Sequence, residues 1–374
     1  MIWKTVKLGE LLDIQNGYAF NSKKFASDGD MPLIRIRDLK NAMTTKTFYT
    51  GDYDDKYIIN SGDLLVGMDG EFRCYEWKGE PALQNQRVCK LQNFHNDLNQ
   101  YFLLYVINGE LKKIEDVTGF TTVKHLSSKT IRDIELKLPP LAEQERIVAK
   151  LDAAFAEIDE SIKNINLKEI KLDKFKSAII SDSYRGNGWD NERLGDCVSY
   201  EKNNAKGSSL PYVGMENIAP ETMDLVGEIV IPKKTSSTFH FNKSHVLFGR
   251  LRPYLRKVLV PDFEGQCSTE IFCIKPKDKV IREFLAYWLL EQKISSKIEA
   301  TSTGARMPRA NMNALLEFDF PIPSTKEQKK IISKIDLIFT KIREAKNTLA
   351  KSKTNYFALK SAILSQELQS SEAA

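Results

Sequence analysis

Two stretches of the chain repeat apolar residues at alternating steps of four and three positions for more than four heptads. From Ile147 to Ile179, eight of the ten positions on this stripe are apolar, and from Ile331 to Ile363 only Ser352 is polar. A spacing of 3.5 residues sustained over this length is typical of a coiled coil, because it keeps the stripe on one side of a helix. The pattern predicts two long helices, over 139–182 and 323–370.

The ends of these helices are also marked. No glycine or proline occurs from Leu141 to Arg185 or from Ser324 to the C-terminus, whereas both residues are frequent elsewhere. Pro139-Pro140 ends the preceding strand. Ser324 and Glu327 have the spacing of a capping box, which predicts the start of the second helix.

Each apolar stripe needs a partner, and charge favours the other helix. Residues 142–182 carry seven basic and nine acidic residues, whereas residues 324–369 carry ten basic and four acidic ones. We therefore expect an antiparallel pair, which would place the two globular parts at opposite ends of one rod. Pairing with another protein or with a second copy is the alternative. The expected interface consists of Ile147, Leu151, Ile158, Ile165, Leu172, Ile179, Ile331, Ile335, Ile338, Ile342, Leu349, Leu359 and Ile363.

The two halves of the chain resemble each other at an offset near 184 residues. LPPLAEQERIVAKLD (138–152) aligns with IPSTKEQKKIISKID (322–336), and weaker matches pair PLIRIRDL (32–39) with PYVGMENI (211–218) and TGFTTVKHL (118–126) with TGARMPRAN (303–311). Internal repetition of this kind indicates a duplicated architecture. We divide the chain into a first variable domain (1–138), a first helix (139–182), a second variable domain (183–322) and a second helix (323–370).

The variable domains are predicted to mix strands and short helices. PLIRIRDL, NQRVCKLQ (85–92) and SHVLFGRL (244–251) alternate like strands, and turn signals such as Ser61-Gly62 and Asp69-Gly70 separate such segments. FLLYVING (102–109) and REFLAYWLLEQKI (282–294) are expected to be short helices. The expected fold class is α+β, with two pseudo-repeated globular domains joined by two long helices that form an antiparallel coiled coil.

The composition excludes several classes of protein. With 374 residues, 42% hydrophobic and 28% charged, the chain is neither disordered nor fibrous. Its longest apolar runs fall far short of the roughly 20 residues of a membrane-spanning helix, and its N-terminal segment has no export signal. We therefore expect a cytoplasmic protein that does not contact a membrane. The net charge of +5 is compatible with nucleic-acid binding but too small to demonstrate it.

Signatures of catalysis and metal binding are absent from the sequence. The five cysteines form no CxxC and the four histidines form no HExxH, so we expect buried, neutral thiols in a reducing compartment and no metal site. The chain also lacks the phosphate loop GxxxxGK[ST], GxGxxG and GxSxG. We therefore predict no catalytic residues. A duplicated chain with two unlike domains favours a binding protein.

The duplicated helix starts, LPPLAEQERIVAKLD and IPSTKEQKKIISKID, each behind a variable domain, resemble the specificity subunits of type I restriction-modification enzymes. The resemblance covers essentially the whole chain. The second copy departs slightly from the first, with Pro321-Ile-Pro323-Ser324 in place of Leu138-Pro-Pro-Leu141, which leaves the helix start intact.

The resemblance implies a non-catalytic subunit that confers sequence specificity on a multi-subunit enzyme of host defence. Each variable domain would be a target-recognition domain for one half of a split double-stranded DNA sequence, and the helices would set the gap and dock two modification subunits. These subunits would use S-adenosylmethionine to methylate adenine N6, and restriction subunits would use ATP and Mg²⁺ to translocate and cleave DNA. No cofactor is expected on this chain itself.

Candidate DNA-binding residues are basic, amide or aromatic side chains, because arginine reads guanine and further cations hold phosphates. In the first domain, Arg35 and Arg37 alternate with apolar residues and would share one face of a strand. The second domain concentrates basic residues around an aromatic in GRLRPYLRK (249–257). The full set is Arg35, Arg37, Arg73, Gln84, Arg87, Lys124 and His125 in the first domain, and Arg250, Arg252, Tyr254, Arg256, Lys257, Arg306 and Arg309 in the second.

Overall charge limits how these domains can bind DNA. Residues 1–141 contain 19 basic and 19 acidic residues, and residues 183–323 contain 19 and 17. Binding must then come from local patches, so we expect weak and salt-sensitive binding by the chain alone and tight binding only with its partners. The alternative function is a non-catalytic adaptor, in which the coiled coil is a rod and both variable domains bind proteins.

Overall fold

The structure is a computed structural model that describes residues 3–118, 124–186, 188–205, 208–232, 237–304 and 306–373. The chain forms two compact units. Unit 1 comprises Met1–Ile162 and Thr354–Ala374, and unit 2 comprises Lys163–Lys353. Each unit therefore contains one variable domain and a part of both long helices.

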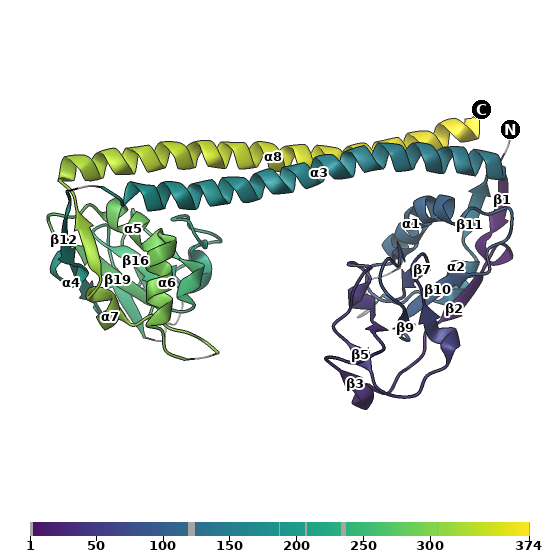
Figure 1. Cartoon of the computed structure of the whole chain (residues 1–374), viewed down its shortest axis with the longest axis horizontal. Coiled ribbons are helices and arrows are strands. Elements are labelled where there is room, and N and C mark those ends of the chain that lie inside the picture. The colour runs from purple at the N-terminus through teal and green to yellow at the C-terminus, as the bar shows by residue number, and fades with distance from the viewer. Residues whose placement is uncertain are drawn as a thin grey trace. The chain divides into compact units, whose positions relative to one another are not determined.

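Unit 1 is built on a four-stranded sheet of order β2-β10-β7-β8, which is accompanied by smaller sheets β4-β9-β6, β1-β11 and β3-β5 (Figure 1). Helix α1 buries Phe102, Leu103, Ile107 and Leu111 in one core with strands of the four-stranded sheet. The elements are β1 (Lys4–Lys7), β2 (Asp13–Asn16), β3 (Phe25–Ala26), β4 (Leu33–Ile34), β5 (Phe48–Tyr49), β6 (Ile58–Ile59), β7 (Leu64–Gly67), β8 (Cys74–Glu76), β9 (Ala82–Gln84), β10 (Val88–Gln92), α1 (Gln100–Val117), α2 (Ser128–Arg132) and β11 (Glu135–Leu138).

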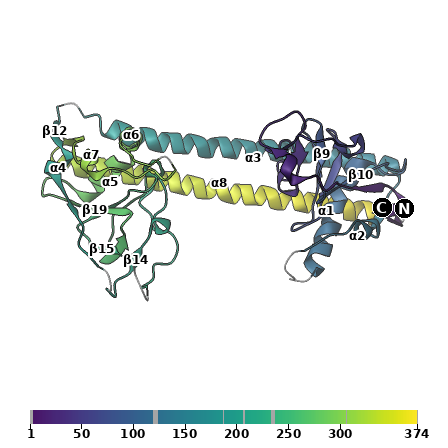
Figure 2. The same cartoon turned by 90° about the horizontal axis from the view of Figure 1, so that it is seen from below.

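Unit 2 repeats this topology with sheets β13-β19-β16-β17, β14-β18-β15 and β12-β20. In Figure 2 the strands β14 and β15 lie beside β19. The elements are β12 (Asp190–Arg193), α4 (Leu194–Cys197), β13 (Val198–Glu201), β14 (Tyr212–Val213), β15 (Thr238–Phe241), β16 (Val246–Gly249), β17 (Val258–Leu259), β18 (Gly265–Ser268), β19 (Ile271–Pro276), α5 (Arg282–Leu290), α6 (Gln292–Ala300), α7 (Met312–Leu316) and β20 (Asp319–Ile322).

The strand pairings show that the duplication extends to the variable domains. The pair β4 and β9 is parallel, and so is its counterpart β14 and β18, whereas the neighbouring pairs in both small sheets are antiparallel. The order of the four-stranded sheet is likewise the same in both units. The weak sequence matches between the two variable domains therefore correspond to a repeated fold. Of TGFTTVKHL, residues 119–123 lie outside the described residues.

Two local predictions were wrong. The strand expected over PLIRIRDL ends at Ile34, and residues 36–38 form a 3-10 helix in which the Asp38 carboxylate accepts a hydrogen bond from the Arg35 N–H at 3.0 Å. This local bond ends the strand, so Arg35 and Arg37 do not share a strand face. The single helix expected over REFLAYWLLEQKI is broken at Glu291, which has an extended backbone between α5 and α6.

The long helices are α3 (Leu141–Ser183) and α8 (Thr325–Ala373), which run antiparallel and side by side within each unit (Figures 1 and 2). In unit 1 the Lys360 ammonium lies 2.5 Å from the Asp159 carboxylate. In unit 2 Lys353 donates to Asn166 at 2.8 Å, and Lys346 lies 2.5 Å from Asp173. Three lysines one heptad apart on α8 therefore face oxygen acceptors one heptad apart on α3, as the opposite net charges predicted.

The predicted capping box is confirmed at the start of α8. The Ser324 N–H donates to the Glu327 carboxylate at 3.1 Å, and the Glu327 N–H donates to the Ser324 hydroxyl oxygen at 3.3 Å. The Ser324 hydroxyl also donates to the Glu327 carboxylate at 2.8 Å. This bond and the one from the Ser324 N–H lower the pKa of the Glu327 carboxyl, because they favour its charged form.

The buried stripe follows the 3.5-residue pattern in the first half of each helix and departs from it in the second half. Ile147, Leu151, Ile158 and Ile165 are buried on α3, and Ile335 and Ile342 are buried on α8, whereas Leu172, Ile179, Ile331, Ile338, Leu349 and Ile363 are half-buried. Leu359, which we expected in the interface, is 45% exposed, and so is its counterpart Phe175 at 50%. A helix of 3.6 residues per turn drifts away from a strict 3.5-residue repeat. Lys176 and Lys360, one position later, turn inward instead.

A buried glutamine anchors each long helix to the domain that precedes it. The Gln144 side chain accepts from the Asn99 N–H and donates to the carbonyls of Asp97 and Pro139, at 2.7 to 2.9 Å. The Gln328 side chain makes the same three bonds to Ile281, Lys279 and Pro323, at 2.7 to 3.0 Å. Both glutamines are fully buried. The matched Glu-Gln pairs of the sequence therefore include a structural joint that occurs twice.

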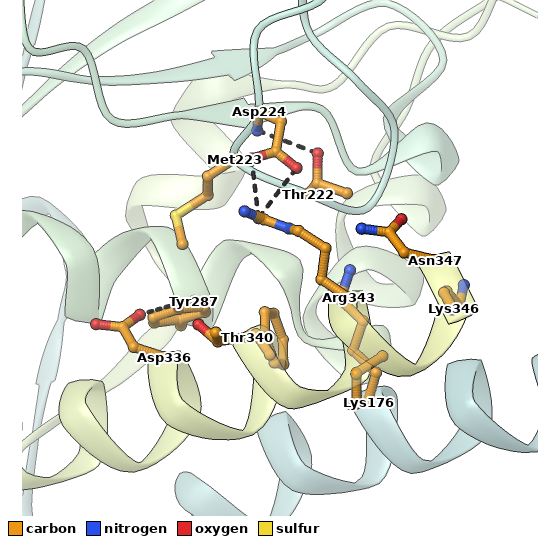
Figure 3. Close-up of a pocket in the computed structure, with 12 residues that line it drawn as sticks. Lys176, Thr222, Met223, Asp224, Tyr287, Asp336, Thr340, Arg343, Lys346 and Asn347 are labelled. Carbon is orange, nitrogen blue, oxygen red and sulfur yellow. Dashed lines mark hydrogen bonds and ion pairs between the residues drawn. The ribbon is translucent and has the colours of Figure 1, made fainter. Parts of the chain in front are cut away.

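Unit 2 contains a cavity of about 450 Å³ between a loop of its variable domain and the long helices (Figure 3). Arg343 of α8 reaches the carboxylate of Asp224 at 3.2 Å, and Lys176 of α3 donates to the Glu221 carbonyl at 2.7 Å. The Lys176 ammonium also lies 4.8 Å from the centre of the Phe339 ring. Burial lowers the pKa of Lys176. These contacts hold the loop to both helices.

Candidate nucleic-acid interface

Three of the seven predicted DNA-binding residues of the first domain, Arg87, Lys124 and His125, come together where the chain leaves β7. The Met68 N–H donates to the Arg87 carbonyl at 3.0 Å, the Leu126 N–H donates to the Met68 carbonyl at 2.7 Å, and the Gly70 N–H donates to the Lys124 carbonyl at 3.2 Å. Three segments far apart in sequence thus meet. We call residues 68–70, 87 and 124–126 the first junction.

The second domain builds the same backbone junction where the chain leaves β16. The Arg250 N–H donates to the Glu270 carbonyl at 2.9 Å, the Ala310 N–H donates to the Arg250 carbonyl at 2.8 Å, and the Arg252 N–H donates to the Pro308 carbonyl at 2.8 Å. These residues follow those of the first junction by 182 to 184 positions. We call residues 250–252, 270 and 308–310 the second junction.

One position in each junction requires a left-handed backbone. Gly70 has φ of 76° in the first junction, and Arg252 has φ of 52° at the matching place in the second. Glycine adopts this conformation without steric cost, whereas an arginine there is strained. Arg256, four residues later, is also left-handed with φ of 46°. Backbone strain of this kind is concentrated at functional sites.

The side chains of the first junction surround one carboxylate. Asp69 lies 3.2 Å from the Arg87 Nε atom and 2.7 Å from the His125 Nδ1 atom. The Lys124 ammonium points away from this group and donates to the Glu115 carbonyl at 2.7 Å. Arg87 and His125 are half exposed. The first junction therefore presents a carboxylate flanked by two groups that can carry positive charge.

The second junction also surrounds one carboxylate, but the charges come from different segments. Arg309 donates from Nε to Glu270 at 3.0 Å, and its Nη2 atom lies 3.0 Å from the same carboxylate. The Arg250 guanidinium lies 5.5 Å from the centre of the Phe272 ring, with Nε 3.8 Å from Glu270. Glu270 thus stands at the place of Arg87, and Arg309 at the place of His125. The two junctions share a frame and differ in chemistry.

A profile of the type I restriction modification DNA specificity domain matches residues 2–171 and 188–365, which are the two repeated halves. The chain belongs to the type I restriction-modification specificity subunits. The match confirms the resemblance seen in the sequence and the role of this subunit in DNA sequence specificity.

Relatives of the specificity subunit support this assignment over most of its length. It is 28% identical to the EcoBI specificity subunit of Escherichia coli, with 90% of this chain and 79% of that one covered. It is 20% identical to the MjaVIII specificity subunit of Methanocaldococcus jannaschii, over 94% and 90%.

Two solved structures share its fold. A chain described in work on complex assembly and conformational transition of the type I R-M system has a TM-score of 0.73 at 17% identity, over 98% and 97% of the two chains. The HsdS subunit of Thermoanaerobacter tengcongensis has a TM-score of 0.50 at 16% identity, over 98% and 96%. These likenesses confirm the expected fold class.

A shallow hollow of about 240 Å³ lies beside the first junction of the specificity subunit. Asp69, Arg37, Lys40 and Glu71 all line it. The Lys40 ammonium lies 2.9 Å from the Glu71 carboxylate, and this hydrogen bond lowers the pKa of Glu71. Arg73 lies over the Tyr75 ring and 3.7 Å from Glu71. Arg37 and Arg73 are both more than half exposed, so the hollow has a charged rim.

Several candidate DNA-binding residues of the specificity subunit form hydrogen bonds or ion pairs within the protein. Gln84 is fully buried, and its amide donates to the carbonyls of Gln15 and Val88 at 2.9 Å. Arg256 is buried, pairs with Glu221 at 2.6 Å and donates to the Leu290 carbonyl at 3.3 Å. The Lys257 ammonium donates to the Met215 carbonyl at 2.5 Å. The polar groups of Gln84, Arg256 and Lys257 thus have partners within the domain.

Other candidates lie at the surface. Arg252 and Arg306 are exposed, and Tyr254 is 45% exposed. Arg35 is half-buried with its guanidinium 6.0 Å from the centre of the Phe25 ring. The loop expected over GRLRPYLRK is therefore exposed at Arg252 and Tyr254 only, while its last two basic residues turn inward.

The sequence reasoning missed the carboxylates of both junctions. Asp69 was recognised only as part of an Asp-Gly turn, and Glu270 carried no signal of its own. The one available sign was that Asp69 stands four residues before the candidate Arg73. Within the part of the chain that the structure describes, no three His, Cys, Asp or Glu side chains could hold a metal ion, and no helix is long and apolar enough to cross a membrane.

Proposed function

We propose that this specificity subunit reads a split double-stranded DNA sequence, with the first junction contacting one half-site and the second junction the other. The observation that carries the proposal is the repeated junction, which keeps one backbone frame and changes its charged groups. A common frame suits a common docking geometry on the duplex, and different hydrogen-bonding groups suit different bases.

Phosphate contacts would come from the exposed cations around each junction. Arg37 and Arg73 lie beside the first junction, and Arg252 and Arg306 belong to the second domain's exposed loops. Because each domain contains nearly as many acidic as basic residues, these patches are local. Binding by the chain alone should be weak and should fall steeply with salt. Nanomolar binding that is insensitive to salt would contradict this part of the proposal.

The long helices would set the gap between the half-sites. Helix α3 has 43 residues, or about 65 Å at 1.5 Å per residue, which exceeds the roughly 34 to 36 Å of one DNA turn. A four-residue helical block after Ile165, with a matching block after Lys353, preserves the pairing because Asn166 and Lys353 face each other. We expect a changed gap and unchanged half-sites, read by sequencing of methylated DNA. An altered half-site would refute the spacer role.

The helices would also dock two modification subunits, which the restriction subunits then join. Large apolar side chains remain exposed on them, including Ile170 at 52% and Leu337 at 58%, and exposed apolar side chains support a contact role when they cluster. Ile170→Glu should abolish copurification with the modification subunit, whereas Lys168→Glu, at an exposed position on another face of the same helix, should not. If both variants still copurify with the modification subunit, the docking surface lies elsewhere. S-adenosylmethionine, ATP and Mg²⁺ would be bound by these partners, in the cytoplasm.

The decisive test compares methylated bases across the genome with and without this gene. Loss of one split, asymmetric methylated motif is the expected result. An unchanged pattern of methylation would favour the adaptor, whose two domains bind proteins instead of DNA.

A further inference from the structure

Each junction contains one partly exposed arginine whose Nε side is occupied by a carboxylate. The Arg309 Nε and Nη2 atoms lie 3.0 Å from Glu270, and the Arg87 Nε atom lies 3.2 Å from Asp69. The two side chains are 36% and 52% exposed. Among the candidate arginines in the described residues, these two have Nε within hydrogen-bonding distance of a carboxylate.

This arrangement leaves the outer edge of each guanidinium available. An arginine has five N–H donors in a planar fork. Glu270 occupies the edge formed by Nε and Nη2. Among the residues that the structure describes, the edge formed by Nη1 and the second Nη2 hydrogen of Arg309 is left with one long contact, from Nη1 to the Met307 carbonyl at 3.4 Å.

The same reasoning holds for Arg87. Its Nη1 atom lies 3.5 Å from His125 Nδ1, but this nitrogen is 2.7 Å from the Asp69 carboxylate. Asp69 as a carboxylate can only accept, so His125 Nδ1 carries a hydrogen toward Asp69 and cannot accept from Arg87. The outer edge of Arg87 therefore has no acceptor in the junction, while Asp69 restricts the orientation of the fork.

We propose that Arg87 and Arg309 each read one guanine, in different half-sites, through hydrogen bonds from the outer guanidinium edge to the guanine O6 and N7 atoms. This inference rests on the proposed function and goes further, because it assigns a base to a residue in each domain. Guanine presents two acceptors in the major groove, whereas adenine presents an N6 amino donor beside N7. The fork therefore discriminates between the two purines.

Asp69 and Glu270 are positioning residues in this scheme. They hold the guanidinium before DNA arrives, which reduces the side-chain freedom lost on binding. The acid comes from different segments in the two domains: in the first junction it follows β7, and in the second it lies between β18 and β19. The same frame can thus direct an arginine from different segments, which fits two unlike half-sites.

The test is a double-mutant cycle with the full chain in complex with its modification subunits. Once the methylated motif is known, each guanine of a duplex substrate is replaced in turn by 7-deazaguanine, which lacks the N7 acceptor. When the contacted guanine is replaced, we expect the rate at which the wild-type complex methylates the duplex to fall about tenfold. In the Arg309→Ala variant, 7-deazaguanine at one position of one half-site should cause no further loss. In the Arg87→Ala variant, the same should hold at one position of the other half-site.

Further variants separate base reading from folding. Arg309→Lys keeps the charge and loses the fork, so selection from duplexes randomised in both half-sites should relax at one position and leave the other half-site unchanged. Glu270→Gln should reduce the coupling to N7 without abolishing methylation. Arg185→Lys, an exposed arginine paired with Asp182 in unit 2, is the control and should leave selection unchanged.

The outcomes distinguish this inference from the function on which it rests. If the wild-type complex selects a motif but neither arginine couples to any guanine N7, the reading role of these arginines is overturned. If deletion of the gene leaves DNA methylation unchanged, the proposed function itself fails.

Discussion

Replacement of Gln328 by methionine tests the joint between the second domain and α8. Methionine has nearly the volume of glutamine but cannot make the three hydrogen bonds of the buried amide to Ile281, Lys279 and Pro323. One backbone N–H and two carbonyls would then lose their partner. The change therefore removes polar bonding while it preserves packing.

The expected loss of stability follows from these three groups. An unsatisfied buried donor or acceptor costs about 1 to 3 kcal/mol. The hydrogen bonds of Gln328 to the Lys279 carbonyl and the Ile281 N–H are only partly buried. We therefore expect the free energy of unfolding of unit 2 to decrease by about 3 kcal/mol in total. For a unit of this size, that corresponds to a fall in Tm of about 6 to 12 °C. Gln144→Met should lower the stability of unit 1 by a similar amount.

Differential scanning calorimetry of the full chain measures both effects, because each variant should shift the transition of one unit. Gln366→Met, at an exposed position of α8, is the matched control and should change Tm by less than about 2 °C. If Gln328→Met shifts the transition no more than this control, the amide is not a stabilising joint and the reasoning fails.

Three further predictions concern the helices and the thiols. Asp173→Lys, which opposes Lys346 in unit 2, should lower stability by about 0.5 kcal/mol at low salt, and the exchange Asp173→Lys with Lys346→Asp should restore it; urea titrations that show no recovery would exclude the pairing. Because the folded-state pKa of Glu327 lies below its ordinary value of 4.5, its stabilising effect is complete above that pH and is lost as pH falls through the lowered pKa. Glu327→Gln should thus be less stable than the wild type at pH 7, and the difference should vanish once the pH has fallen below the lowered pKa of Glu327; a difference that persists in acid would count against the capping box. All five cysteines are free and buried, and burial raises the pKa of Cys89 to about 12 and that of Cys197 to about 11; a thiol reagent at pH 8 should label them only after denaturation, and rapid labelling of the native protein would contradict this.

The long helices could be predicted because their signals are local. The apolar stripe, the lack of glycine and proline and the Ser324 to Glu327 spacing each act within one or two helical turns. The second half of each stripe could not be predicted from a strict heptad, since the drift of a real helix replaces Phe175 and Leu359 with the lysines that follow them. Lys176 and Lys360 then lie over Phe339 and Phe155 rather than in solvent.

The candidate interface was only partly predictable. Composition and turn signals identified Arg87, His125 and Arg309 as candidates, but the same criteria also selected Gln84 and Arg256, which are buried. Local sequence does not reveal which side of a short strand or turn faces the core. The carboxylates of both junctions were missed. Asp69 stands beside a glycine, where an acidic residue most often belongs to a solvated turn, and the sequence neighbours of Glu270 gave no signal.

The sequence by itself determined the duplication, the two long helices and the family, because each depends on residues close together in the chain or on repetition along it. The tertiary structure alone decided which side chains meet at the junctions. Arg87 lies 38 residues from His125 and Asp69 lies 56 residues from it, and only the backbone hydrogen bonds between three distant segments bring them together. Because those bonds involve no side chains, the same frame can hold Asp69 with Arg87 in one domain and Glu270 with Arg309 in the other.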